Sequence, residues 1–164
     1  MPKDPKQVLI LGGGFAGVCT ARYLEKLLRP EEASITLVNR ENYWVYQPML
    51  PQVISGSIGL INIVSPLRRL CPRTNLVMRE VEAIDLDKQI VTISPGFRPR
   101  QLQLTYDHLV IALGNITDFH GMPGMMENAS RFGPSPTPWC SAITSFARSR
   151  KPISRTTRNC VASC

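Results

Sequence analysis

Six consecutive residues, three of them adjacent glycines, have the spacing of a phosphate-binding turn. Gly12, Gly14 and Gly17 satisfy the pattern G-x-G-x-x-G. We expect Gly12 to turn the chain sharply, Gly14 to leave room for a pyrophosphate, and Gly17 to let a helix pack closely. The phosphates would lie at the positively polarised start of that helix. The alternative is a glycine turn with only a structural role. The residues of the predicted dinucleotide site are Gly12, Gly13, Gly14, Phe15, Ala16 and Gly17.

An amide stands where such a site usually has an acid. The acid that holds the ribose follows the glycine motif by about 20 residues, and Asn39 occupies this place. Asn39 can exchange hydrogen bonds with a ribose hydroxyl but carries no charge, and the nearby Glu41 could substitute for it. Arg40 is a candidate to stack on or flank the adenine, with a solvated surface charge as the alternative.

The elements that position these residues follow from the spacing of apolar side chains. Residues 8–11 form a short apolar run, which is typical of a strand buried on both faces. Residues 16–28 have helical spacing and are followed by Pro30, and residues 35–38 form a second apolar strand. This order predicts a βαβ unit with parallel strands. The glycine motif therefore has the context that a dinucleotide-binding turn requires.

Further strands are expected later in the chain. Residues 76–78 predict a third strand, and residues 81–86 and 89–93 predict a hairpin. Residues 94–104 are expected to form a surface loop or another edge strand. The fold class is therefore α/β, with a Rossmann-type dinucleotide-binding parallel sheet and an inserted β-hairpin layer.

A second motif indicates which dinucleotide, FAD or NAD, the glycine turn binds. Tyr106 and Asp107 precede a predicted buried strand at residues 109–113, which Gly114 closes. This arrangement resembles two-dinucleotide flavoproteins, in which such a strand lies beside the first one and its terminal glycine passes close to the flavin. The resemblance predicts FAD as the cofactor of the glycine motif.

A third motif is rich in aromatic residues and proline. Residues 41–53 read ENYWVYQPMLPQV, and we expect residues 41–63 to form a loop that leads into a short helix. With residues 114–124, GNITDFHGMPG, this segment resembles the type II NADH:quinone oxidoreductases, single-subunit enzymes of the pyridine nucleotide-disulphide oxidoreductase superfamily. The resemblance covers residues 6–129.

The resemblance implies roles for several residues. It places Pro48 and Leu50 beside the isoalloxazine and gives Val81 a backbone contact to the adenine. It also implies FAD as cofactor, with NADH and a quinone as small-molecule substrates of the parent enzyme. The flavin would carry the chemistry, and no catalytic residue or metal site is assigned. His108 and His120 are expected to be structural or exposed rather than acid–base groups.

Other functions stay open. The chain could be an FAD- or NAD-binding module without turnover, a non-functional gene remnant, or part of a sulfide:quinone oxidoreductase. Residues 41–70 contain no cysteine, which excludes the dithiol relay of the related disulfide reductases. The five cysteines form no C-x-x-C pair, so we expect idle thiols in a reducing compartment.

Composition divides the chain in two. Residues 130–164 hold six of the 19 basic residues and none of the 12 acidic ones, so the net charge of +7 comes mostly from this tail. The nearly neutral remainder gives no reason to expect nucleic acid as a partner. The tail is rich in Ser, Thr and Pro and lacks periodicity, which predicts disorder. We therefore divide the chain into an FAD-binding partial domain, residues 1–129, and the tail.

We expect the tail to be translated out of frame. Reading its codons from their third base allows a peptide that begins PFRTLAD and continues with helical periodicity. The Trp139–Cys140 and Asn159–Cys160 pairs force valine and leucine in that frame, which agrees with this peptide. The chain would then be an amino-terminal fragment that is inactive alone, and downstream DNA would test this.

No stretch reaches the roughly 18 apolar residues of a membrane span. We expect a cytoplasmic chain, and a parent enzyme attached peripherally to the cytoplasmic face of the membrane through residues absent from this sequence.

Overall fold

The computed structural model describes residues 4–95, 102–115, 118 and 120–124. The chain divides into two compact units, of which the first joins Met1–Val45 to Val64–Asn115 and the second joins Tyr46–Ile63 to Ile116–Cys164. The predicted out-of-frame and disordered tail, residues 130–164, lies outside the described residues. The first unit contains the glycine motif.

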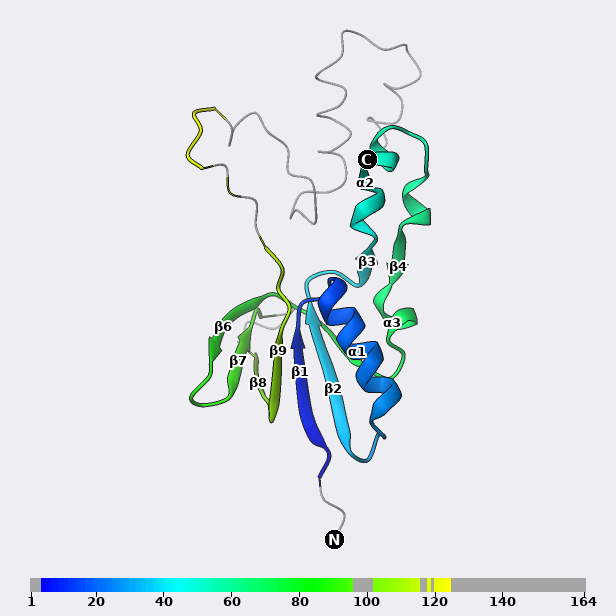
Figure 1. The fold of residues 1–164 in the computed structure, drawn as a ribbon. Helices are drawn as coiled ribbons and strands as arrows, with labels where there is room; N and C mark the ends of the chain where they lie inside the picture. Colours follow the sequence, from blue (N-terminus) through cyan, green and yellow to red (C-terminus); the bar gives the residue numbers. More distant parts are fainter. Residues whose placement is uncertain (1–3, 96–101, 116–117, 119, 125–164) are drawn as a thin grey trace. The chain divides into compact units, whose positions relative to one another are not determined.

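A parallel sheet of four strands forms the centre of the first unit (Figure 1). In spatial order its strands are β5 (Asn75–Met78), β2 (Ala33–Asn39), β1 (Lys6–Leu11) and β9 (His108–Ile111). Val8 of β1 pairs with Ile35 of β2 on one side and with His108 of β9 on the other. The predicted βαβ unit, the third strand and the strand beside the first are confirmed.

The last strand ends earlier than predicted. β9 stops at Ile111, whereas the sequence predicted a strand through residue 113. The N–H of Ala112 still donates to the carbonyl of Leu11, at 2.8 Å. The chain then leaves the sheet and reaches Gly114, which has a φ of 77°.

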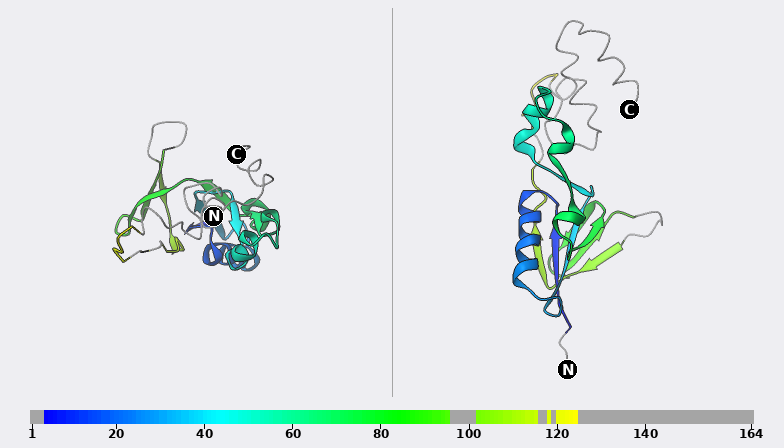
Figure 2. Two further views of the ribbon diagram at one scale, coloured as in Figure 1. Left: turned by 90° about the horizontal axis from the view of Figure 1, so that it is seen from above. Right: turned by 90° about the vertical axis from the view of Figure 1, so that its right-hand side faces the viewer.

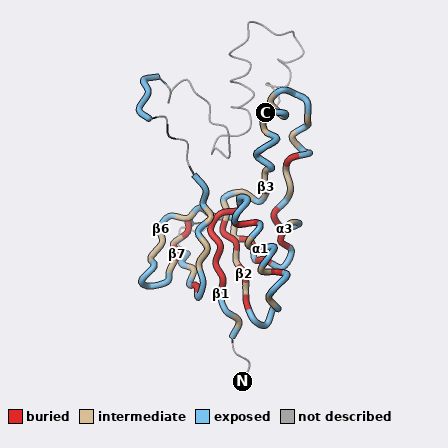
Figure 3. The backbone as a smooth tube through the Cα atoms, viewed as in Figure 1, coloured by how far each residue is buried: buried red, intermediate tan, exposed pale blue. Residues whose placement is uncertain are grey.

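One face of the sheet is covered by α1 (Phe15–Leu27), as Figure 2 shows. Alternate residues of β1, Val8 and Ile10, point to this side and pack with Val18 and Ala21 of the helix. Figure 3 shows the buried residues concentrated in β1 and β2. The core on this face comprises Val8, Ile10, Val18, Ala21, Ala33, Ile35, Leu37, Leu67, Cys71 and Leu76.

The other face is covered by an antiparallel sheet (Figure 2). Its strands are β6 (Val81–Asp85), β7 (Ile90–Ile93) and β8 (Leu102–Thr105), in this order. The predicted hairpin is confirmed, and residues 102–105 form the additional strand that the sequence left as an alternative. A second core joins the two sheets and comprises Leu9, Leu11, Val38, Val91, Ile93 and Tyr106.

Three short elements of the first unit were not predicted. β3 (Tyr43–Val45) pairs antiparallel with β4 (Val64–Pro66), and α3 (Leu67–Leu70) follows directly. The strands have three residues each, which is too short for an alternating pattern to be recognised. Leu67 is almost completely buried, and its N–H donates to the carbonyl of Asn42 at 2.8 Å, so these elements are anchored to the α1 side of the sheet.

The second unit contains η1 (Gln47–Met49), α2 (Leu50–Ile54) and η2 (Leu60–Asn62). The expected short helix is confirmed by α2, whereas β3 occupies part of the segment that was expected to be a loop. The Ser55 hydroxyl donates to the carbonyl of Gln52 at 2.9 Å, where the helix ends. Within the described part of the chain, no helix has the length and apolar character needed to cross a membrane.

Candidate functional site

The glycine motif lies at the carboxyl ends of β1, β2 and β9. The N–H of Gly12 donates to the carbonyl of Val38 at 2.8 Å, which ties the loop to β2. Gly12 has a φ of 101°, and a Cβ at this position would overlap the carbonyl oxygen of Ala112. Only glycine therefore makes the sharp turn while passing this close to the chain after β9, as the sequence predicted.

Gly17 seats the helix on the turn. A Cβ on Gly17 would overlap the carbonyl oxygen of Gly12 and would lie 3.5 Å from Cγ2 of Ile10. Both Gly17 and Gly12 are buried. The start of α1 is thus held against the end of β1, and the predicted close helix–strand contact is confirmed.

Gly14 differs from its neighbours. It precedes the first residue of α1 and is exposed, and its backbone is extended, with φ −79° and ψ −164°, which any residue adopts. A Cβ on Gly14 would meet no atom within 4 Å, and no side chain caps the helix there. The first N–H groups of a helix lack partners within the helix and favour an anion. The space beside Gly14 suits a phosphate group.

The amide of Asn39 bridges two loops of the chain. Its Oδ1 accepts a hydrogen bond from the N–H of Gly13, and its Nδ2 donates to the carbonyl of Glu41, both at 2.8 Å. A Cβ on Gly13 would come within 2.8 Å of Cγ of Asn39. The side chain expected at the ribose is therefore engaged by the protein itself.

Arg40 lies on the surface beside Glu80. Its guanidinium is 3.4 Å from the Glu80 carboxylate, and both side chains are about half exposed. The backbone N–H of Arg79 donates to the carbonyl of Asn39 at 3.0 Å. This geometry matches the surface-charge alternative for Arg40, and a contact to adenine stays a prediction.

Two aromatic residues meet beside the loop. The rings of Phe15 and Trp44 have centroids 4.9 Å apart at an interplanar angle of 67°. The sequence assigned Phe15 to the site but gave no signal for its pairing with Trp44. This edge-to-face contact joins the start of α1 to β3.

The carboxyl end of α1 is also fixed by residues that the sequence did not single out. The Glu25 carboxylate is buried and accepts from the N–H of Arg73 at 2.9 Å and the hydroxyl of Thr74 at 2.7 Å. The Arg73 guanidinium donates to the carbonyls of Glu25 and Leu28. The helix that carries the glycine motif is therefore anchored at both ends.

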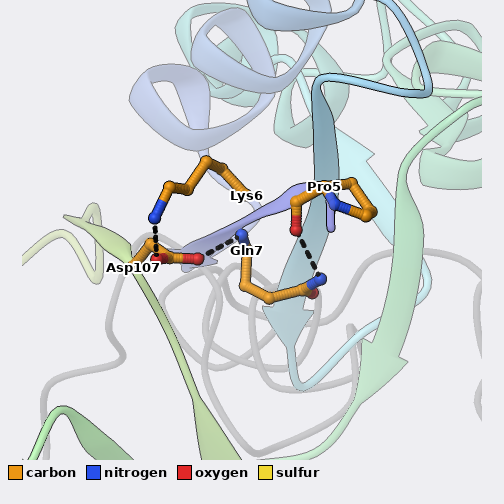
Figure 4. A network of polar contacts seen from close by, with 4 residues as sticks. All are labelled: Pro5, Lys6, Gln7 and Asp107. Atoms are coloured by element: carbon orange, nitrogen blue, oxygen red, sulfur yellow. Dashed lines mark hydrogen bonds and ion pairs between the residues drawn. The ribbon is translucent and has the colours of Figure 1, made fainter. Parts of the chain in front are cut away.

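Asp107 joins β1 to β9 at the opposite end of the sheet (Figure 4). Its carboxylate accepts from the ammonium of Lys6 at 2.6 Å and from the N–H of Gln7 at 2.8 Å. These bonds, the one from Lys6 foremost, hold the pKa of Asp107 below its usual value of 3.8. Tyr106 is buried in the second core. In this structure the Tyr-Asp pair acts on the sheet rather than at the glycine motif.

Thiol and imidazole groups form no catalytic arrangement in the described residues. Cys71 is buried in the core beneath α1, and burial raises the pKa of its thiol to about 11. His108 is exposed at the start of β9, and His120 lies 3.4 Å from the Asp118 carboxylate on the surface. Across the same residues, no group of three or more His, Cys, Asp or Glu is placed to hold a metal ion.

Residues 6–137 match the pyridine nucleotide-disulphide oxidoreductase family. The chain belongs to this family. Among its relatives, the type II NADH:quinone oxidoreductase of Staphylococcus aureus is 33% identical over 131 residues, which are 79% of this chain and 31% of that protein. The chain thus spans less than a third of the length of the curated relatives it matches.

Solved structures of longer proteins share the fold. The sulfide:quinone oxidoreductase of Aquifex aeolicus is 30% identical with a TM-score of 0.72, over 87% of this chain and 31% of that one. NDH2 from Plasmodium falciparum in complex with NADH has a TM-score of 0.67 at 20% identity, over 87% and 27% of the two chains. The second likeness concerns the fold alone.

In this member of the pyridine nucleotide-disulphide oxidoreductase family, most predicted site residues meet at one edge of the sheet. Asn39 ends β2 beside the glycine motif and Arg40 follows it, Val81 follows β5 closely, and Gly114 follows β9. Pro48 and Leu50 belong to the second unit, and their place beside an isoalloxazine stays a prediction.

Proposed function

We propose that this chain forms the FAD-binding part of an NADH-dependent flavoprotein oxidoreductase of the type II NADH:quinone oxidoreductase kind. Family membership and the S. aureus relative support the class. The single observation that carries the cofactor assignment is the open, uncapped position of Gly14 at the start of α1. A bound pyrophosphate requires open space next to free N–H groups, and a glycine turn with only a structural role does not require that space.

The residues of the loop fit the adenosine diphosphate half of FAD. The start of α1 would hold the pyrophosphate, because its N–H groups and the helix dipole favour negative charge. The ends of β2 and β5, with Arg40 and Val81, would flank the adenosine. When bound, the flavin would supply hydride and electron transfer between NADH and a quinone. The protein would bind and orient it.

A titration of the purified chain tests the cofactor assignment. We expect the chain to bind one FAD, seen as a change in flavin absorbance and fluorescence, and to bind NADH more weakly. Tighter binding of NADH than of FAD would overturn the assignment. A chain that binds neither would match the gene-remnant alternative.

The 164 residues contain one G-x-G-x-x-G pattern. We therefore propose that this chain supplies the flavin site and that NADH binds to residues beyond it in a longer protein. In that case FAD bound to this chain is not bleached by NADH, and the purified chain does not reduce a quinone. Turnover by the homogeneous chain would refute this division.

A sulfide:quinone oxidoreductase is the second candidate, because the A. aeolicus enzyme is 30% identical and shares the fold. In a longer protein that carries this chain, reduction of the flavin by NADH favours the first candidate and reduction by sulfide the second. Peripheral attachment of such a protein to the cytoplasmic face of the membrane is likewise a proposal, which fractionation of membranes tests.

A further inference from the structure

The side chain of Asn39 could have either of two roles: it could bind the ribose of the cofactor, or it could hold the glycine loop in place. A Rossmann-type site usually has an acid here, which accepts a hydrogen bond from the ribose. In this chain the acceptor atom, Oδ1, already receives the N–H of Gly13, and the donor atom, Nδ2, already serves the carbonyl of Glu41.

We propose that Asn39 is a positioning residue that fixes the Gly13 peptide and thereby the phosphate-binding loop, and that it does not bind the ribose. The inference rests on the proposed function, since it concerns how that same loop holds FAD. It assigns the amide a structural duty that an acid at this position cannot perform.

The two contacts require an amide. One partner is an N–H, which needs an acceptor, and the other is a carbonyl, which needs a donor. A carboxylate offers only acceptors, so an aspartate would set a negative oxygen against the carbonyl of Glu41. A serine hydroxyl is too short to bridge both loops. Among side chains of this size, only asparagine presents both groups at once.

The close packing at Gly13 also supports a positioning role for Asn39. The G-x-G-x-x-G pattern allows any residue at this position, yet a Cβ here would lie 2.8 Å from Cγ and 2.9 Å from Nδ2 of Asn39, and 3.0 Å from Cδ1 of Leu67. Gly13 is buried. The middle glycine of the run is thus explained by the packing of the Asn39 amide and not by a ligand.

The hydrogen bond from the Gly13 N–H also shows which N–H groups of the loop are used within the protein and which remain for a phosphate. The N–H of Gly12 is directed to β2 and that of Gly13 to Asn39. Phosphate binding therefore falls to the positions that follow, where α1 begins and Gly14 leaves open space. Without the Asn39 amide, the Gly13 peptide is free to rotate, and the start of the helix is less well placed.

A thermodynamic cycle between Asn39 and the ribose hydroxyls separates the two roles. ADP, 2′-deoxy-ADP and 3′-deoxy-ADP are titrated into the wild-type chain and Asn39→Ala. We expect the substitution to weaken all three by the same factor, about 3- to 10-fold, as for the loss of one or two hydrogen bonds. The preference for ADP over each deoxy form is then unchanged. Disappearance of that preference in Asn39→Ala would overturn the proposal.

Asn39→Asp gives the sharpest contrast. If Asn39 supports the loop, this substitution weakens FAD binding at least as much as Asn39→Ala. If Asn39 binds the ribose, the acid maintains or tightens binding, which contradicts the proposal. Glu41→Ala is the matched control for the hydrogen bond itself, because Nδ2 of Asn39 donates to the backbone carbonyl of Glu41 and not to its side chain.

A measurement on the ligand-free chain keeps this inference distinct from the proposed function. We expect amide hydrogen exchange at Gly13 to accelerate at least several-fold in Asn39→Ala and in Asn39→Asp, and to stay unchanged in Glu41→Ala. Unchanged exchange in all three variants would overturn the positioning role. If the wild-type chain binds neither ADP nor FAD while the two Asn39 variants show the accelerated exchange, the proposed function alone is overturned.

Discussion

β1 is joined to β9 at both of its ends, and the two ends are built differently. At the amino end, the Asp107 N–H donates to the carbonyl of Gln7, and charged side-chain contacts are added to this bond, from the Asp107 carboxylate to the Lys6 ammonium and to the Gln7 N–H. At the carboxyl end, backbone meets backbone, because Gly12 passes against the carbonyl of Ala112. The amino end is complete with residues of this chain. The carboxyl end leaves open space at Gly14.

The difference shows what each end is for. The charged side chains at the amino end of β1 can rearrange at little cost in stability, because they are partly exposed and water can replace their contacts. The carboxyl end of β1, the glycine end, tolerates no added side chain at Gly12 or Gly17, where backbone touches backbone. Within the glycine motif, a side chain fits at Gly14, which faces open space. We interpret the first as a support of the sheet and the second as a site for a ligand.

The largest effect is expected for Gly17→Ala. The new methyl group would overlap the carbonyl oxygen of Gly12, and backbone atoms can relieve this only by moving the helix off the strand. We expect the free energy of unfolding to fall by about 2–3 kcal/mol, measured by urea denaturation. Gly14→Ala is the matched control, because its methyl group meets no atom within 4 Å. Equal stability of the two variants would contradict the packing described for the loop.

A smaller effect is expected at the amino end. Asp107→Asn removes the ion pair with Lys6 and weakens the bond to the Gln7 N–H. The urea midpoint should fall by less than in Gly17→Ala, and FAD affinity should not change, because Asp107 lies at the far end of β1. Lys6→Met should add little to Asp107→Asn, since both remove the same contact. Loss of FAD binding in Asp107→Asn would show that the two ends are not independent.

The smallest effect is the pH dependence of this support. Because its pKa in the folded chain lies below the usual value of 3.8, the ionised Asp107 contributes stability above that value, and the contribution is lost as the pH falls through the lowered pKa. The difference in urea midpoint between the wild type and Asp107→Asn should therefore be constant from about pH 5 to 7, and should shrink on further acidification. A difference that grows in acid would contradict this assignment.

The sequence predicted the glycine end better than its surroundings. The roles of Gly12 and Gly17 followed from a spacing that reflects backbone contacts, which depend on the absence of a side chain and on little else. The partners of Asn39 could not be predicted, because they are a backbone N–H and a carbonyl that any residue provides. The Phe15–Trp44 contact and β3 were missed for a related reason, since they depend on how a loop returns to the sheet.

The Tyr106–Asp107 pair shows another limit. The sequence used the pair only to recognise the strand that Gly114 closes, placed Gly114 close to the flavin, and gave the pair itself no role. The structure places Asp107 at the amino end of β1, where it binds Lys6. The two ends of a strand lie at opposite ends of the sheet, so the role of the pair at the amino end of β1 could not be read from its closeness in sequence to Gly114.

FAD binding by Gly14→Val, measured beside the wild type, tests the phosphate site at Gly14 most directly. We expect the wild-type chain to bind FAD and Gly14→Val not to bind it, because the valine side chain occupies the space of the pyrophosphate. We also expect the variant to keep a circular dichroism spectrum and a urea midpoint close to those of the wild type. Equal FAD affinity of the two chains would show that the open position at Gly14 is not the phosphate site.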